Sequence, residues 1–257
     1  MENDKKTLKK MEKFRLVFHG TALFHHCIAG AYSKFPVQDY SNVTDQRVLD
    51  VKDFELKFFT TWNMVFQTLY FALAFSFDLS RYVPILKPHK KLLDFNGYIF
   101  TAVVFPCSCY VSLLFWTIYY INREYVLPEV VDEFVPTWLN HMVHTNIVPF
   151  VMVEIFMTNL NKPSLKSAIL GLTGLTIIYK IIFFHTYFQT GRWIYALFSV
   201  LTWNERVAIS LFNYMMTVCF LKLGSSIQKY KHKIIENKYV TKYEKFKKDL
   251  LLNNPIY

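Results

Sequence analysis

Six apolar runs alternate with polar segments along this chain of 257 residues. A helix that crosses a bilayer needs about 20 mostly apolar residues. The runs of suitable length are residues 14–31, 58–77, 97–119, 137–158, 167–187 and 207–224. They predict an all-α fold, a polytopic membrane bundle of six transmembrane helices. The first run carries His19, His25 and His26, so an interfacial helix is the alternative for that segment.

The distribution of charge gives this bundle an orientation. The net charge is +10, and with a cytoplasmic N-terminus 21 of the 29 Lys and Arg residues lie on the cytoplasmic side and 7 on the other, with Lys180 inside a predicted span. This asymmetry follows the positive-inside rule and places both basic tails in the cytoplasm, which requires an even number of spans. We therefore expect the tails to face anionic lipid, and we expect no binding to nucleic acid.

Three regions follow from these two patterns. They are a basic cytoplasmic tail (1–13), a six-helix transmembrane domain (14–224) and a Lys-rich cytoplasmic tail (225–257). The charged N-terminus has no small-residue cleavage site, so no removable signal peptide is expected. The sequon at Asn42 lies in a predicted outer loop, in agreement with the charge count. We expect a multi-pass integral protein of the plasma membrane or an endomembrane, with no protein partner indicated.

The composition, with 53% hydrophobic and 18% aromatic residues, is unlike that of a typical soluble domain. Motif searches exclude several enzyme classes. HExxH, GxSxG and Walker A motifs are absent, and the eight histidines are too scattered for a di-iron desaturase. The four cysteines fall in predicted spans without a CxxC pair, which favours a packing role. We expect neither a cofactor nor a metal.

The most informative polar group stands at the start of the fourth apolar run. Asn140, His141 and His144 have i,i+3 and i,i+4 spacings and so share one helix face. Titratable groups are costly in hydrocarbon, which makes them candidates for a functional site. Pro149, in the same run, would free the carbonyl of Thr145, and a bend there would help to open a cavity.

A partner for His144 is expected at the outer start of the second run. Thr60 lies roughly 8 Å from His144 in depth, a gap that tilt and side-chain reach can close. A hydroxyl beside an imidazole is the minimal nucleophile–base pair, although Thr is also common as a packing residue in membrane helices. Thr61 is the alternative if the register slips.

Acidic and basic groups elsewhere leave further alternatives open. Glu154 and Lys180 are the two charges deep in predicted spans, and we expect them to pair across the bundle. Otherwise one of them would titrate near the substrate. Glu124 or Glu133 could orient an imidazole, although a solvated loop is the simpler interpretation.

Several of these segments together resemble a known family, that of the androgen-induced-gene and androgen-dependent TFPI-regulating proteins. The residues that carry the resemblance are Phe115, Trp116, Arg123, Glu124, Pro128, the stretch 134–145, Pro149, Phe150 and Glu154. Further matches are Lys57-Phe58-Phe59-Thr60 with Gln67, and the later loop residues Gly191, Trp193 and Tyr195. Departures are Ala196 where a proline is expected, Asn63 where an acid is sometimes seen, and a longer basic N-terminus.

The resemblance implies a six-span membrane protein that acts as a threonine hydrolase on fatty-acid esters of hydroxy fatty acids. It places the nucleophile at Thr60 and the base at His144. Helix geometry adds Asn140 as a candidate oxyanion donor or imidazole orienter, and His141 as a residue that shapes the site or packs. The alternative function is non-catalytic, either a transporter or a lipid-binding regulator of other membrane proteins.

Overall fold

The computed structural model describes residues 2–34, 40–83, 88–160 and 163–253. The fold is all-helical, with 84% helix and no strand among those residues. The longer helices are α1 (Glu2–Lys34), α2 (Gln46–Asp53), α3 (Phe59–Leu79), α4 (Lys90–Ile99), α5 (Phe105–Asn122), α6 (Thr137–His144), α7 (Ile147–Met157), α8 (Leu165–Thr190) and α9 (Trp203–Asn253). The short 3-10 helices are η1 (Glu55–Lys57), η4 (Arg123–Tyr125), η5 (Glu129–Glu133) and η6 (Ala196–Ser199), and η3 (Phe100–Val104) is a π-helical segment that joins α4 to α5.

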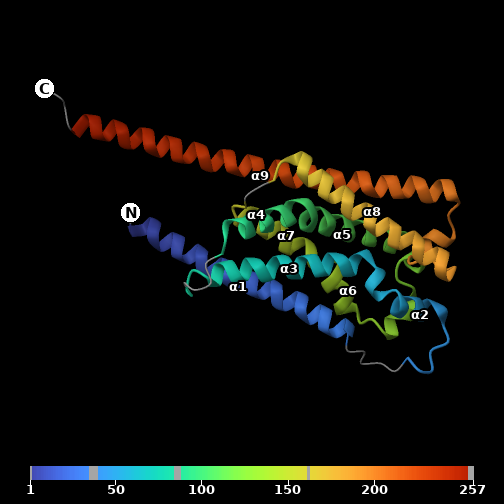
Figure 1. Cartoon of the computed structure of the whole chain (residues 1–257). Helices are drawn as coiled ribbons and strands as arrows, with labels where there is room; N and C mark the ends of the chain where they lie inside the picture. Colours follow the sequence, from blue (N-terminus) through green and yellow to red (C-terminus); the bar gives the residue numbers. More distant parts are fainter. Residues whose placement is uncertain (1, 35–39, 84–87, 161–162, 254–257) are drawn as a thin grey trace.

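The long helices lie side by side as a bundle (Figure 1). The start of α1 and the far part of α9 project beyond the same end of this bundle, and α2 lies at the opposite end. A chain that crosses a membrane an even number of times has its first and last helices projecting on the same side. Residue 1 and residues 254–257 of the predicted tails lie outside the described residues.

Three helical segments among the described residues are long and apolar enough to cross a membrane. They are Lys90–Tyr125, Leu165–Thr190 and Trp203–Asn237, and they contain the third, fifth and sixth predicted spans. These segments support a membrane protein and confirm the all-α prediction. The other three predicted spans are helical but do not meet the same criteria, so the count of six is not confirmed.

The fourth predicted span is divided into two short helices. α6 ends at His144 and α7 begins at Ile147, so neither half is long enough to cross a bilayer alone. The predicted bend lies at this position, because the break at Thr145 and Asn146 stands four and three residues before Pro149. The carbonyl of Thr145 is not left free, because it accepts a 3.2 Å hydrogen bond from the Val148 N–H.

Helix α9 does not end at the predicted boundary between bundle and tail. It continues as one helix through Gly224 to Asn253. At Gly224 it crosses α5 so closely that a Cβ atom would lie 2.6 Å from the Phe105 ring. Glycine is therefore required there by close helix approach, whereas the sequence alone suggested an end to the packed region.

The expected pair between Glu154 and Lys180 is wrong. Glu154 accepts a hydrogen bond from the Tyr70 hydroxyl at 2.5 Å, and its other oxygen lies 2.8 Å from His19 Nε2. Lys180 instead donates to Ser210 Oγ at 3.0 Å. The physical reason is helix rotation, because Glu154 on α7 faces α1 and α3 while Lys180 on α8 faces α9.

A buried ion-pair cluster therefore forms away from α2, where α1, α3 and α7 meet. We call it the carboxylate cluster, and it consists of Arg15, His19, Tyr70, Asp78 and Glu154. His19 Nδ1 lies 2.8 Å from Asp78, which also accepts from Arg15 at 2.6 Å. The cluster ties α1 into the bundle, which argues against a separate interfacial helix for this segment.

Candidate active site

A cavity of about 600 Å³ lies among the helices at the end of the bundle that carries α2 and α6. Its wall is mostly apolar and aromatic, with contributions from α3, α5, α6, α8 and α9. Volumes of about 300–1,000 Å³ are typical of small-molecule sites. The polar side chains on this wall include those of Thr60, Asn140, His144, Lys180 and Tyr195.

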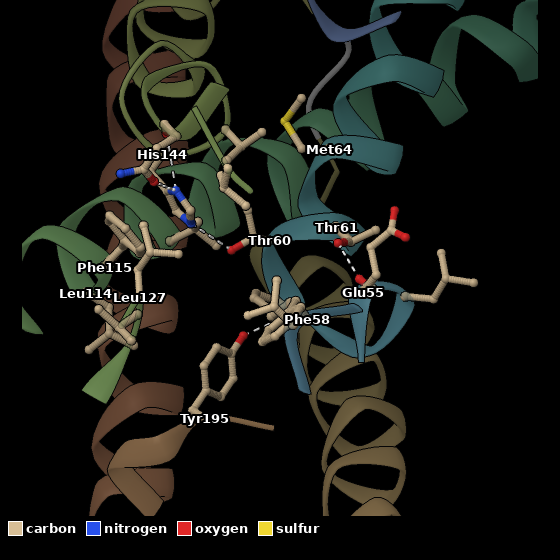
Figure 2. Close-up of a pocket in the computed structure, with 18 of the residues that line it drawn as sticks. Glu55, Phe58, Thr60, Thr61, Met64, Leu114, Phe115, Leu127, His144 and Tyr195 are labelled. Atoms are coloured by element: carbon tan, nitrogen blue, oxygen red, sulfur yellow. Dashed lines mark hydrogen bonds between the residues drawn. The ribbon is translucent and has the colours of Figure 1, made fainter. Parts of the chain in front are cut away.

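Thr60 and His144 meet at this cavity (Figure 2). The Thr60 Oγ1 atom lies 3.2 Å from His144 Nε2, although the two residues are 84 positions apart in the chain. Phe58 is an extended N-cap, so α3 begins at Phe59 and Thr60 stands in its first turn. His144 is the last residue of α6, directly before the break. Two helix ends therefore present a hydroxyl and an imidazole to each other.

The second nitrogen of His144 is held by acceptors. His144 Nδ1 lies 2.7 Å from Asn140 Oδ1 and 3.2 Å from the Asn140 backbone carbonyl. A carbonyl only accepts, so Nδ1 carries the ring proton. Nε2 then has a free lone pair, and it points at the Thr60 hydroxyl. The Phe115 ring stacks on the imidazole at 3.5 Å between centroids and 12° between planes, which fixes the ring orientation.

These contacts place Asn140 where an imidazole orienter, one of the two roles expected for it, would stand. The same spacing does not bring His141 to the cavity. His141 stacks on Trp116 at 5.2 Å and its Nδ1 lies 2.9 Å from Thr145 Oγ1. His141 is exposed and does not line the cavity, which fits a packing role.

Thr61 also lines the cavity but makes a different contact. Its hydroxyl donates to the Glu55 carbonyl at 2.6 Å, as Figure 2 shows. The Thr61 hydroxyl donates its proton to this backbone carbonyl and not to an imidazole. The geometry therefore pairs His144 with Thr60, and the alternative register is disfavoured.

Tyr195 is a site residue that the residue pattern alone did not single out. Its hydroxyl accepts the Phe59 N–H at 3.0 Å and the Tyr179 O–H at 3.4 Å. Because the oxygen accepts both bonds, its own proton remains available to a group in the cavity. The left-handed conformation of Gly191, at φ 70°, ends α8 and turns the chain toward this segment. The only sequence signal was the loop motif of Gly191, Trp193 and Tyr195.

The acidic residues considered as orienters lie elsewhere. Glu124 accepts from Arg47 at 3.0 Å and from the Glu129 N–H at 2.8 Å, so it joins loop segments outside the cavity. Arg47 also hydrogen-bonds Asp45, and this contact lowers the pKa of that carboxyl. No group of three or more His, Cys, Asp and Glu residues that could hold a metal occurs in the part of the chain that the structure describes.

Comparison with known proteins identifies relatives of the whole bundle. A model of the family described as FAR-17a/AIG1-like protein matches residues 14–229. The androgen-dependent TFPI-regulating protein of Homo sapiens is 30% identical over 175 residues, which cover 68% of this chain and 76% of the relative. The Mus musculus protein of the same name is 35% identical over 146 residues (57% and 64%). The androgen-induced gene 1 protein of Homo sapiens is 29% identical over 146 residues (54% and 61%). No solved structure matches the chain significantly.

Proposed function

The chain belongs to the FAR-17a/AIG1-like family, and we propose that it is an integral-membrane hydrolase that cleaves fatty-acid esters of hydroxy fatty acids. Thr60 is the nucleophile and His144 the base in this proposal. The observation that carries it is the 3.2 Å contact between Thr60 Oγ1 and His144 Nε2, made in a cavity with a largely apolar wall. The names of the relatives refer to androgen response and TFPI regulation and specify no reaction.

The proposal includes a six-span topology with both termini in the cytoplasm. α1, α3, α8 and α9 each cross once, α4 with α5 forms one crossing, and α6 with α7 forms another. The bias of Lys and Arg and the common side of the two chain ends support this arrangement (Figure 1). Residues 14–224 then form the membrane domain between two basic tails, and the cavity opens in the outer half.

Acylation begins with proton transfer. Nε2 of His144 accepts the Thr60 proton as Oγ1 attacks the ester carbonyl carbon, and a tetrahedral oxyanion forms. When this intermediate collapses, the bond to the alcohol oxygen breaks. The departing alkoxide takes the proton from Nε2 and leaves as a hydroxy fatty acid, and the acyl group stays on Thr60.

The oxyanion needs donors that are in place before the reaction. Tyr195 supplies one, because its hydroxyl is fixed by Phe59, the neighbour of Thr60, and keeps its own proton for the cavity. The N-terminus of α3 supplies a second favourable field, since Thr60 stands in the first helical turn and the positive end of a helix dipole stabilises anions. Asn140 contributes by holding the imidazole, with no contact to the ester.

Deacylation repeats the sequence with water. His144 Nε2 takes a proton from water, the resulting hydroxide attacks the acyl carbon, and Thr60 leaves with the proton returned by Nε2. The products are one fatty acid and one hydroxy fatty acid. Acylation uses the side chains of Thr60 and His144, and deacylation adds one water molecule.

The test is turnover by the purified full-length protein in detergent micelles. A branched fatty-acid ester of a hydroxy fatty acid is incubated with wild type, Thr60→Ala, His144→Ala and Thr61→Ala, and both products are quantified. We expect equimolar products from wild type and from Thr61→Ala, and none above background from the other two. Full activity in Thr60→Ala or His144→Ala would contradict the proposal. A folded but inactive wild type would instead favour a transporter or a lipid-binding regulator.

A further inference from the structure

A lysine from helix α8 lies on the wall of the same cavity. Lys180 is half-buried on α8, and its Nζ donates to Ser210 Oγ at 3.0 Å. The ammonium also sits over two aromatic rings, 5.0 Å from the Phe183 centroid and 5.6 Å from that of Phe198. Within the described residues, no carboxylate lies at ion-pair distance from Lys180.

This environment leaves the charge incompletely satisfied. An ammonium has three N–H donors, and Ser210 accepts one of them. Aromatic faces attract a cation but neither neutralise it nor accept its remaining protons as strong acceptors. A charge in apolar surroundings is costly without a partner, and such residues in membrane helices mark ligand sites. Two donors of Lys180 are therefore available to the two oxygens of one carboxylate.

The other charges on the cavity wall do not compete for this role. Among the described lining residues they are Lys52 and Glu55, from α2 and η1. Both precede α3 and lie outside the predicted spans, and Lys52 sits over the Tyr40 ring at 4.7 Å. Lys180 is thus the lysine that α8 contributes to the cavity from within a predicted span.

We propose that Lys180 binds the free carboxylate of a long-chain acid, and so selects substrates that carry one. In the proposed hydrolase, on which the choice of substrate rests, the carboxylate of the ester would engage Lys180 while its carbonyl lies at Thr60. The apolar wall between these groups receives the hydrocarbon chain. Esters with a blocked carboxyl group are then poor ligands. Carboxylate binding itself needs no turnover, so it is measured separately from hydrolysis.

The experiment measures equilibrium binding of radiolabelled oleate and oleyl alcohol to the purified full-length protein in nanodiscs of neutral phospholipid. The two probes share one chain and differ in charge, and neither contains an ester. Wild type should bind oleate about tenfold more tightly than the alcohol, because hydrogen bonds between charged groups are the stronger ones. Lys180→Met should lose this preference while its affinity for oleyl alcohol stays unchanged. Lys180→Arg should retain it.

Two further variants separate this inference from the hydrolase proposal. Lys166→Met removes an exposed lysine from the same helix and should keep the preference for oleate. Thr60→Ala should keep it as well, even if the protein proves to have no hydrolase activity. Equal binding of both probes by wild type would overturn the inference, as would a preference that survives in Lys180→Met. If Lys180→Met binds neither ligand and no longer elutes from a size-exclusion column at the native volume, Lys180→Gln is tested instead. Equal binding of oleate and oleyl alcohol by wild type overturns the inference in that case too.

Discussion

Two imidazoles at different ends of the bundle, the buried His19 and the half-buried His144, have opposite surroundings. His19, in the carboxylate cluster, has a carboxylate oxygen 2.8 Å from each ring nitrogen. His144 has carbonyl oxygens of Asn140 at one nitrogen and the Thr60 hydroxyl at the other. His19 does not line the cavity and His144 does. The same residue type thus joins two carboxylates at one end and, in the proposed mechanism, acts as the base at the other.

The difference between His19 and His144 shows that the groups around a histidine ring determine whether it can take part in proton transfer. The His19 ring is held by two carboxylates and has no lone pair directed at a reactive group. It stabilises the fold because it gives the buried Asp78 and Glu154 a hydrogen-bond partner. A ring held at one nitrogen by a neutral acceptor keeps a lone pair for proton transfer. A neighbouring hydroxyl and a cavity then make chemistry available. Variants at the two histidines should separate these roles.

The largest effect is expected at the dyad. Thr60→Ala and His144→Ala should each lower the hydrolytic rate by roughly 10³-fold or more, because either change removes the nucleophile–base pair. Thr60→Ser keeps a hydroxyl and should retain measurable activity. Rates are compared at equal amounts of folded protein, with thermal unfolding as the check. A Thr60→Ala variant as active as Thr60→Ser would break the comparison between the two histidines.

At the other end, a loss of stability is expected in place of a loss of catalysis. His19→Leu leaves Asp78 and Glu154 without the group that joins them, and breaking a buried ionic network costs about 3–5 kcal/mol. The midpoint of thermal unfolding in detergent should fall, while the rate per folded molecule stays near that of wild type. His185→Leu, at an exposed position on α8, is the matched control and should leave the midpoint unchanged. Loss of activity at an unchanged midpoint would show that His19 acts in the reaction.

Tyr195→Phe removes the proposed oxyanion donor. Loss of one such donor costs about 10²- to 10³-fold in kcat. KM should change little, because the interaction strengthens as the oxyanion forms. Tyr179→Phe is the comparison variant, because it removes the long 3.4 Å contact to the Tyr195 hydroxyl and leaves that hydroxyl in place, so kcat should fall less than in Tyr195→Phe. Equal kcat values for Tyr195→Phe and wild type would contradict the role of Tyr195 and leave the N-terminus of α3 as the main element that stabilises the oxyanion.

A smaller effect is expected at Asn140, the positioning residue. Asn140→Leu removes the side-chain acceptor at His144 Nδ1 but leaves the backbone carbonyl, so kcat should fall about tenfold to a hundredfold through misorientation. Asn140→Asp retains an acceptor and should recover most of the rate. Steady-state kinetics of both variants give the comparison. If Asn140→Asp were as slow as Asn140→Leu, an amide N–H rather than the oxygen would be the important group.

The sequence predicted the local features well and the inter-helix partners poorly. The apolar runs placed Thr60 and His144 near run ends on the same side of the bundle, and the family resemblance then selected these two as nucleophile and base. Their 3.2 Å contact agrees with that placement. The break after His144 was foreseen only as a bend at Pro149. Helix ends and breakers are local properties, which the sequence records directly.

Partners across the bundle depend on how each helix is rotated, and residue spacing does not determine this. Glu154 and Lys180 are complementary in charge, but they face different neighbours. Glu154 contacts His19 and Tyr70, whereas Lys180 contacts Ser210. Tyr195 was named only as part of the loop motif, with no role assigned, because it follows α8 in an irregular segment with no helical period. Its role emerges only from the Phe59 N–H that its hydroxyl accepts.

The most direct test of the catalytic claim is to locate a covalent adduct. Full-length protein in native membranes is treated with a fluorophosphonate, which reacts with activated hydroxyl nucleophiles, and the modified peptide is identified by mass spectrometry. The account predicts modification at Thr60 in wild type and in Thr61→Ala, and no modification in Thr60→Ala or His144→Ala. Modification at Thr61, or unmodified wild type at full expression, would contradict the assignment of Thr60 as the nucleophile.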